Sequence, residues 1–198
     1  MSSRVQICNM ALAALGQDQF IQSPTERSKG NDTCSLFYDT VRDLLLRAHD
    51  WNFARRRRVL ALTAAEVTNW QYAYRYPSDC LAIRWLVIVG TRTPARNARV
   101  PYEIATDGDQ KLILTDLAEA EIVYTARITN TTLFDETFVH AFSLALGVKI
   151  AMPMAVDPGL AKNVAQQARE ALGEAIAGDL NEEQADIEPE SELITVRA

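Results

Sequence analysis

The sequence has few of the residues that build catalytic and metal centres. It contains only two histidines, His49 and His140, and three cysteines, and none of them stands in a C-x-x-C or H-E-x-x-H spacing, which are ligand patterns of zinc sites. Its eight glycines form neither G-x-G-x-x-G nor a P-loop, so the usual phosphate-binding turns are missing. A G-x-S-x-G nucleophile elbow is missing as well. We therefore expect structural histidines, no metal, no cofactor and no enzymatic activity.

Long apolar runs and cysteine pairs are also missing. No stretch reaches the roughly eighteen apolar residues that read as a membrane span, and the first residues have neither the apolar core nor the cleavage site of a signal peptide. Cys8, Cys34 and Cys80 are odd in number and far apart, which indicates reduced, buried thiols in a cytosolic protein rather than a disulfide framework. We expect a chain that neither crosses a membrane nor is exported.

Positive charge is scarce overall but locally concentrated. Twenty lysines and arginines stand against 26 aspartates and glutamates, which gives a formal net charge of −6 and a pI near 5.0. Because phosphate binding depends on clustered Lys and Arg, this balance argues against a protein that binds nucleic acid over its whole surface. One basic cluster is present, and it consists of Arg55, Arg56, Arg57 and Arg58.

Both ends of the chain have the apolar period of amphipathic helices. A first helix is predicted to stop at Gly16, and a second has an apolar stripe made of Cys34, Phe37, Tyr38, Val41, Leu44, Leu45 and Ala48. A third begins after Asp135, which is placed to cap it, and is expected to kink or end at Pro153. A fourth opens at Asp157, an N-cap followed by a proline at the first helical position.

The middle of the chain is rich in short β-prone runs. They occupy residues 59–62, 72–76, 86–89, 102–104, 111–114 and 120–128 and are separated by turn residues. Asp107 and Asp109 flank Gly108, and because the other ligands of a calcium loop are missing, we predict a hairpin turn there. Residues 55–132 therefore look like an antiparallel sheet.

These patterns predict an α+β fold in one domain with an inserted subdomain, as the chain length allows. N- and C-terminal helices, within residues 1–54 and 133–178, form a four-helix bundle, and residues 55–132 form an inserted antiparallel β-rich subdomain. Residues 179–198 are acidic and irregular in pattern and have too little apolar surface to fold alone. We predict that they form an extended C-terminal tail.

The four consecutive arginines allow three interpretations. On a strand their side chains would alternate between two faces, so at most two would share a surface, whereas a loop or helix end could cluster them. They could protect a sheet edge against strand pairing, join carboxylates of a neighbouring subunit or partner, or contact a DNA backbone. Because the chain is acidic, we favour an interface over DNA.

Four segments, in this order along the chain, resemble one known family. They are NMALAALG at 9–16, FYDTVRDLLL at 37–46, DWNFA at 50–54 and YPSDCL at 76–81. The series resembles the head-to-tail adaptor (connector) proteins of tailed phages, that is, the family of tail tubular protein A and the tail accessory factors of short-tailed phages. The likeness rests on motifs over about the first eighty residues and on layout alone after them.

The resemblance implies a non-enzymatic bacteriophage virion protein. Members of the family combine a helical bundle with a β-rich part and assemble as a homo-oligomeric ring, typically a dodecamer, beneath the portal protein. The ring extends the DNA channel and offers a platform for the tail nozzle or tail tube. For this chain the resemblance implies virion assembly in the host cytoplasm, a place in the tail or neck region, and double-stranded DNA that passes during ejection without sequence-specific binding.

The same resemblance assigns roles to particular residues. Trp51 and Phe53 would anchor the sheet to the bundle, which their apolar bulk also predicts. The tail would reach the portal by adding a strand or filling a groove, and the residues at its end are Leu193, Ile194, Val196 and Arg197. An acidic channel wall would repel DNA and leave its passage free.

Two other classes of function stay open. One is a DNA-binding module that uses the four arginines. Its affinity for DNA would fall steeply with salt concentration, and binding would be lost when the arginines are neutralised. An enzyme of unrecognised type would have a pocket between bundle and sheet, and a reproducible hit in hydrolase or ligand screens would favour it. The sequence nominates no base or nucleophile for such an enzyme.

Overall fold

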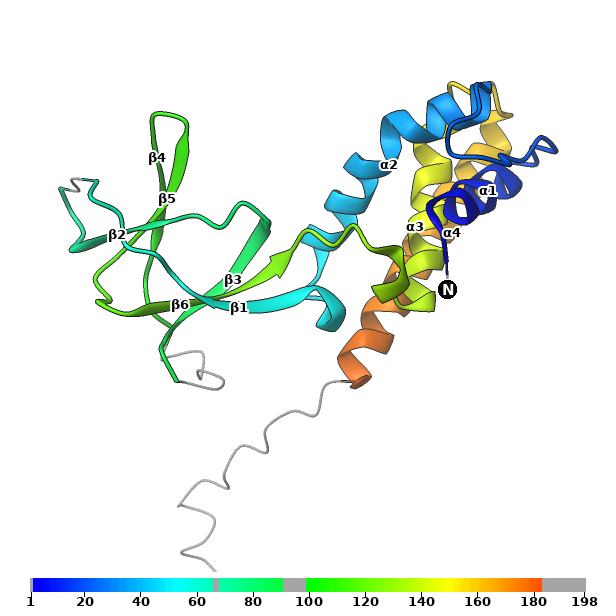
Figure 1. The fold of residues 1–198 in the computed structure, drawn as a ribbon. Helices are drawn as coiled ribbons and strands as arrows, with labels where there is room; N and C mark the ends of the chain where they lie inside the picture. Colours follow the sequence, from blue (N-terminus) through cyan, green and yellow to red (C-terminus); the bar gives the residue numbers. More distant parts are fainter. Residues whose placement is uncertain (1, 66–67, 91–98, 183–198) are drawn as a thin grey trace, which may run out of the picture.

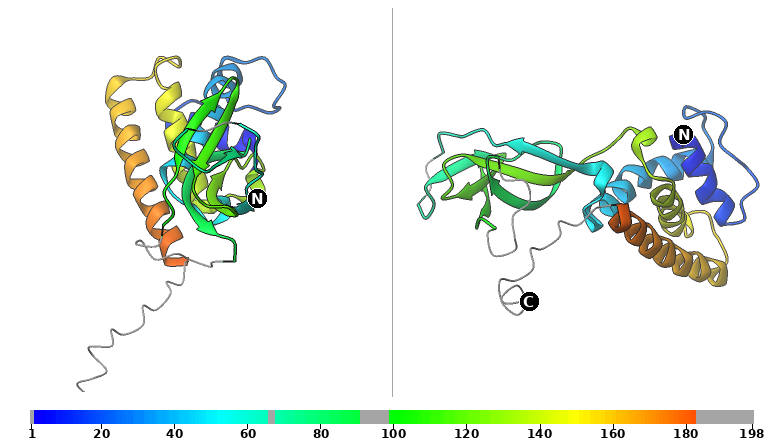
Figure 2. Two further views of the ribbon diagram at one scale, coloured as in Figure 1. Left: turned by 90° about the vertical axis from the view of Figure 1, so that its left-hand side faces the viewer. Right: turned by 90° about the horizontal axis from the view of Figure 1, so that it is seen from below.

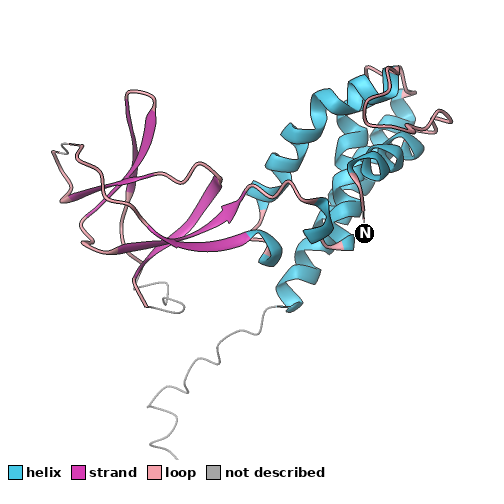
Figure 3. Cartoon of the chain, viewed as in Figure 1, coloured by secondary structure: helices cyan, strands magenta, loops and turns pink. Residues whose placement is uncertain are grey.

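Helices from both ends of the chain lie together at one end of the molecule, and the strands of its middle form the other end (Figures 1 and 3). This arrangement comes from a computed structural model that describes residues 2–65, 68–90 and 99–182. The expected α+β class is confirmed, because four helices and two small antiparallel sheets are present among the described residues.

The helices are α1 (Arg4–Ala14), α2 (Lys29–Ala48), α3 (Glu136–Ile150) and α4 (Pro158–Glu182). Helix α3 contacts the other three, and α3 and α4 run side by side in both views of Figure 2. Helix α4 continues to Glu182, so residues 179–182, which the sequence assigned to an extended tail, are helical. The rest of the predicted tail lies outside the described residues.

The helix ends are set by local hydrogen bonds that the sequence predicts. Asp135 Oδ1 accepts from the backbone N–H of Thr137 at 2.8 Å, and Asp157 Oδ1 accepts from that of Gly159 at 2.8 Å. These carboxylates satisfy donors that have no partner within the first helical turn. Gly16 ends α1 with a φ of 68°, a left-handed conformation that a side chain would disfavour. The predicted caps and the predicted stop at Gly16 are therefore confirmed.

The predicted apolar stripe of α2 is partly wrong. Leu44 is 54% exposed and Ala48 is exposed as well, whereas Leu46 is fully buried. Helix α2 packs on α3 along one side and on strands of the β part near its C-terminal end. Near that end the buried face of the helix therefore includes Leu46 in place of Leu44. Arg42 is also buried. Asp39 and Asp43 both pair with its guanidinium at 2.7 Å and so compensate its charge.

The β part contains two three-stranded sheets where the sequence suggested one. The first sheet has the order β1 (Arg55–Val59), β6 (Ala120–Ala126), β3 (Cys80–Ile88), and the second has the order β2 (Tyr72–Arg75), β5 (Gln110–Thr115), β4 (Glu103–Asp107). All pairings are antiparallel. Strands β4 and β5 form the predicted hairpin, in which Gly108 has a φ of 55°.

The chain passes directly from one sheet to the other after β1. The backbone N–H of Leu60 still donates to Ala120 of the first sheet at 2.9 Å, and that of Thr63 already donates to Ala73 of the second at 2.8 Å. The strand that the sequence placed at 59–62 lies instead at Arg55–Val59, and Leu62 forms only an isolated bridge with Tyr74. Apolar side chains of both sheets, among them Tyr74 and Ile122, join the helices in one continuous core.

Phe138 of α3 provides a test of this core. Its ring is fully buried and lies 5.0 to 6.1 Å from those of Trp51, Phe53, Phe134 and Phe142. We expect Phe138→Ala to lower the free energy of unfolding by about 3–5 kcal/mol, because it leaves a cavity among these rings. Urea denaturation followed by circular dichroism measures the loss. Met152→Ala, at a side chain 90% exposed, is the matched control with an expected change below about 0.5 kcal/mol; equal losses would contradict this core.

The cap of α3 provides a test by pH. The Thr137 side chain, followed by backbone N–H groups, holds the pKa of Asp135 below its usual value. Since the folded-state pKa is depressed, the charged cap stabilises the fold above about pH 3.9, the unfolded value, and this stabilisation is lost as pH falls toward the folded pKa. At pH 7 we expect Asp135→Asn to cost roughly 0.3–1 kcal/mol. The stabilities of the two proteins should converge as pH falls through the depressed folded-state pKa of Asp135; a gap that stays unchanged in the most acidic samples would refute the role of the charge.

Candidate functional site

Six residues connect α2 to β1, and Trp51 occupies the centre of this junction, which we define as residues 49–54. Its indole Nε1 donates to the carbonyl of Leu45 at 2.9 Å, and only 1% of the residue is exposed. The indole packs edge-on against Phe138 of α3, with ring centroids 5.0 Å apart. Trp51 and Phe53 thus anchor the chain where it leaves the helices, as the sequence predicts.

Helix α4 is tied to the same junction by Asp179. One carboxylate oxygen lies 3.1 Å from His49 Nε2, and the other accepts from the backbone N–H of Asn52 at 3.0 Å. The Asn52 side-chain amide donates to the carbonyl of Asp179 at 2.8 Å. Three hydrogen bonds therefore connect residues that are about 130 positions apart in the sequence.

Arg84 connects the junction to the first sheet. From β3 its guanidinium donates to the carbonyls of Arg47, at 3.2 Å, and of His49. These carbonyls belong to the end of α2, where no intrahelical donor is available. The same group donates to Thr125 Oγ1 at 2.8 Å and lies 3.6 Å from Asp50 Oδ1. Burial lowers the pKa of Arg84, and Asp50 opposes that shift.

Sequence reasoning missed Arg84 and Asp179. The signal for Arg84 was a single charge within the apolar run LAIRWLVIV at 81–89, because a charge in such a run needs a partner when it is buried. Asp179 gave no comparable signal, since it stands in the acidic stretch that ends the helix. Both side chains act across large sequence separations.

The four arginines lie on strand β1 at the edge of the first sheet, so their side chains alternate between its faces. Arg56 and Arg58 both point to Asp79, at 3.0 and 3.8 Å, and Arg57 pairs with Glu121 of β6 at 2.9 Å. Arg55 pairs with Asp50 at 2.9 Å. Every arginine of the cluster therefore has a carboxylate partner within the subunit.

These ion pairs bear on what the arginines can contact. The side chains of Arg56 and Arg58 are 50% and 53% exposed, so an outside carboxylate or phosphate can reach them. An incoming DNA phosphate would compete with Asp79 for both guanidinium groups. At most two of the four share a face, which leaves a narrower basic surface than a clustered loop would give. The predicted portal-contacting residues Leu193, Ile194, Val196 and Arg197 lie outside the described residues.

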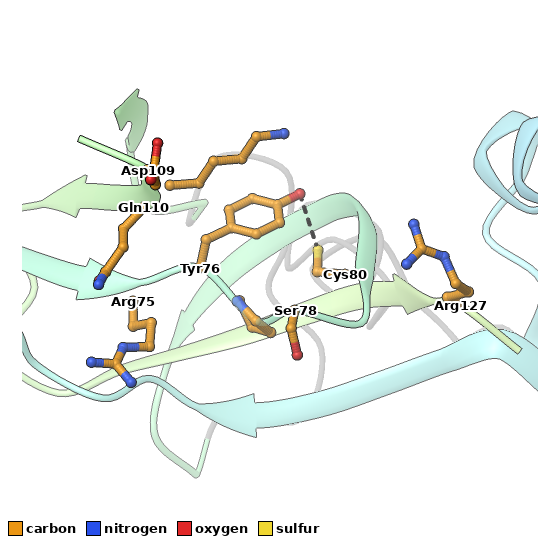
Figure 4. A pocket seen from close by; sticks show the side chains of 9 residues that line it. Arg75, Tyr76, Ser78, Cys80, Asp109, Gln110 and Arg127 are labelled. Carbon is orange, nitrogen blue, oxygen red and sulfur yellow. Dashed lines mark hydrogen bonds between the residues drawn. The ribbon is translucent and has the colours of Figure 1, made fainter. Parts of the chain in front are cut away.

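A surface pocket of about 450 Å³ lies where the two sheets meet (Figure 4). It is lined by the end of β2, the turn into β3, the β4–β5 turn and the residue after β6, namely Arg75, Tyr76, Pro77, Ser78, Cys80, Asp109, Gln110, Lys111 and Arg127. We call it the seam pocket. Three of these residues are basic, namely Arg75, Lys111 and Arg127, and one, Asp109, is acidic.

The seam pocket holds no activated nucleophile. The thiol of Cys80 donates to the Tyr76 hydroxyl oxygen at 3.2 Å (Figure 4). Burial raises the pKa of the Cys80 thiol, and burial together with Cys80 raises the pKa of the Tyr76 phenol. Both groups are therefore protonated at neutral pH and can donate or accept hydrogen bonds, but neither is a thiolate or phenolate nucleophile.

The other polar candidates in the sequence have structural surroundings. His49 contacts Asp179 and the edge of Trp51, as expected of a structural histidine, whereas His140 is exposed on α3. Cys8 and Cys34 are buried thiols, and Cys80 is half-buried. Among the described residues, no group of three or more His, Cys, Asp or Glu side chains is placed to hold a metal ion.

Comparisons with known proteins do not assign a family. No family model matches this sequence, and neither does any curated protein. Within the described part of the chain, none of the helices has the length and apolar character needed to cross a membrane.

Substitution of Arg84 tests the junction. Arg84→Met keeps the apolar stem, removes a cation that faces Asp50 and leaves the carbonyls at the end of α2 without their side-chain donor. We therefore expect a loss of about 2–4 kcal/mol in the free energy of unfolding. Arg84→Lys should recover only part of it, because a compact ammonium group lacks the planar array of five N–H donors that the guanidinium offers. Arg169→Met, on the exposed face of α4, is the control. Chemical denaturation of the variants measures the effect, and a loss no larger than that of the control would refute the role of Arg84.

Proposed function

We propose that this protein is a structural subunit of a tailed-phage virion, a head-to-tail adaptor that assembles as a ring beneath the portal. In this role it extends the DNA channel and provides the platform on which the tail nozzle or tail tube attaches. Ring assembly would take place in the host cytoplasm, and the finished ring would lie in the neck of the virion. DNA would pass through it without sequence-specific binding.

The observation that carries this proposal is the junction. The segment DWNFA at 50–54, part of the resemblance, supplies the residues that join helices to sheet: Trp51 and Phe53 enter the aromatic core, Asn52 binds Asp179, and Asp50 binds Arg55 and Arg84. A ring subunit that contacts a portal through one part and a tail through another needs a fixed angle between them. The extensive pairing at residues 49–54 supports such a subunit.

Two finer features belong to the same proposal. The four helices would act as one bundle that carries the inserted β part, and the residues after α4 would form an extended tail. The end of this tail, with Leu193, Ile194, Val196 and Arg197, would contact the portal. The long apolar side chains exposed on the helices, Leu36 at 71% and Leu44 at 54%, offer surface that neighbouring subunits would cover.

The arginine strand would contribute to contacts between subunits or partners. Arg56 and Arg58 are held in place by Asp79 and keep about half of their surface exposed, so a further carboxylate can bind guanidinium groups that are already oriented. A free sheet edge invites pairing with another strand, and charged side chains on β1 restrict which partners it accepts. This supports an interface more than it supports a DNA contact.

Assembly of the purified chain with a portal ring tests the function. We expect closed rings of this chain on the portal, seen by electron microscopy and weighed by native mass spectrometry. Arg56→Gln together with Arg58→Gln should reduce ring formation at least about tenfold, while the fold loses no more than about 1 kcal/mol per exposed ion pair. Lys162→Gln with Arg169→Gln, both exposed on α4, removes the same charge elsewhere and should leave rings intact.

Two outcomes would contradict the proposal. A chain that stays monomeric and does not join the portal would exclude the adaptor role. Salt-sensitive binding of duplex DNA that disappears in the Arg56→Gln, Arg58→Gln variant would identify the arginine strand as a DNA-binding surface instead.

A further inference from the structure

The seam pocket contains cationic side chains that have no acidic partner among the described residues. Arg75 at the end of β2 and Lys111 of β5 are exposed and pair with no carboxylate of the described chain; Lys111 has only the ring of Tyr76, at 5.7 Å, beneath its ammonium group. Arg127 is the exception, because Asp43 pairs with it at 2.8 Å. The arginines of β1, by contrast, all have carboxylate partners.

The neutral groups of the pocket add hydrogen-bond donors to this charge. Since the Cys80 thiol donates into the Tyr76 hydroxyl oxygen, the Tyr76 O–H is left to donate elsewhere. Ser78 and Gln110 supply a further hydroxyl and amide. Cations and donors around a cavity of about 450 Å³ fit a ligand with several carboxylates. Asp109 is the only carboxylate in the lining, and it opposes such a ligand.

We propose that the seam pocket binds the acidic segment at residues 182–192 of a second copy of this chain. That segment contains six carboxylates, Glu182, Glu183, Asp186, Glu188, Glu190 and Glu192, and no basic residue. Each subunit carries one such segment and one seam pocket, so every pocket in an assembly can be filled by one segment. The more apolar residues 193–197 would stay available for the portal, so the two contacts use different parts of the tail.

The position of α4 favours a neighbouring copy over the same subunit. In the view of Figure 1, α4 ends below strands β1 and β6, whereas the turn from β2 to β3, which carries Tyr76 and Ser78, lies above them. The eleven residues from Glu182 to Glu192 are separated by ten steps that span at most roughly 33–36 Å when extended. Within one subunit, part of that length would go into passing around the sheet. This inference rests on the proposed function, because neighbouring copies must lie side by side.

Peptide binding tests the pocket. The probe is a fluorescent peptide of residues 182–198, and the receptor is the full chain in which the acids of 182–192 are changed to amides, that is, E182Q, E183Q, D186N, E188Q, E190Q and E192Q. Fluorescence anisotropy should show saturable binding that Arg75→Ala with Lys111→Ala weakens at least about tenfold. Lys162→Ala with Arg169→Ala should leave the affinity unchanged. Asp109→Asn should tighten binding, a sign that a purely structural role of the pocket does not predict.

Mixing of two variants decides whether the segment comes from another copy. One variant has the neutralised segment and an intact pocket; the other has the native segment and the Arg75→Ala, Lys111→Ala pocket. We expect each to assemble poorly alone and the mixture to form mixed assemblies on native mass spectrometry. Absence of mixed assemblies, absence of peptide binding, or binding of duplex DNA in the pocket in place of the peptide would each overturn the inference. Rings that form without peptide binding would refute this inference alone, whereas peptide binding by a chain that forms no rings would refute the adaptor role.

Discussion

The fold depends on how the open end of α2 is satisfied at the point where the chain leaves the helices for the sheet. A helix end exposes carbonyl groups without intrahelical donors, and here the guanidinium of Arg84 supplies donors from strand β3. Asp50 balances the charge of Arg84 and also holds Arg55. One cluster of partly buried polar groups therefore fixes the end of α2 and the two outer strands of the first sheet, β1 and β3, relative to one another.

The rest of the junction adds apolar packing and a third helix to this cluster. Trp51 and Phe53 join Phe134, Phe138 and Phe142 in one aromatic core, and Asp179 brings the end of α4 to the same place. A continuous apolar core also runs from the helices into both sheets. Helices and strands are held as one body, which is the property that the proposed role between portal and tail requires.

Local chemistry explains which parts of this structure the sequence predicts. The caps at Asp135 and Asp157, the stop at Gly16 and the turn at Gly108 each depend on residues within a few positions, and all are confirmed. Arg84 and Asp179 depend on partners more than thirty and more than one hundred positions away, so no local pattern locates those partners. The division into two sheets also escapes prediction, since it results from where the chain crosses between them after β1. Leu46 is buried where Leu44 was predicted to be, because α2 packs on α3 and on strands β3 and β6 at the same time.

The central claim is that the junction holds the helices and the sheets at one fixed angle. Residual dipolar couplings of backbone amides, measured by NMR on the unmodified chain in a weakly aligning medium, test it most directly. The account predicts that couplings from α1–α4 and from β1–β6 fit a single alignment tensor. Two tensors of different magnitude or orientation, one for the helices and one for the strands, would show that the two parts move independently and would contradict it.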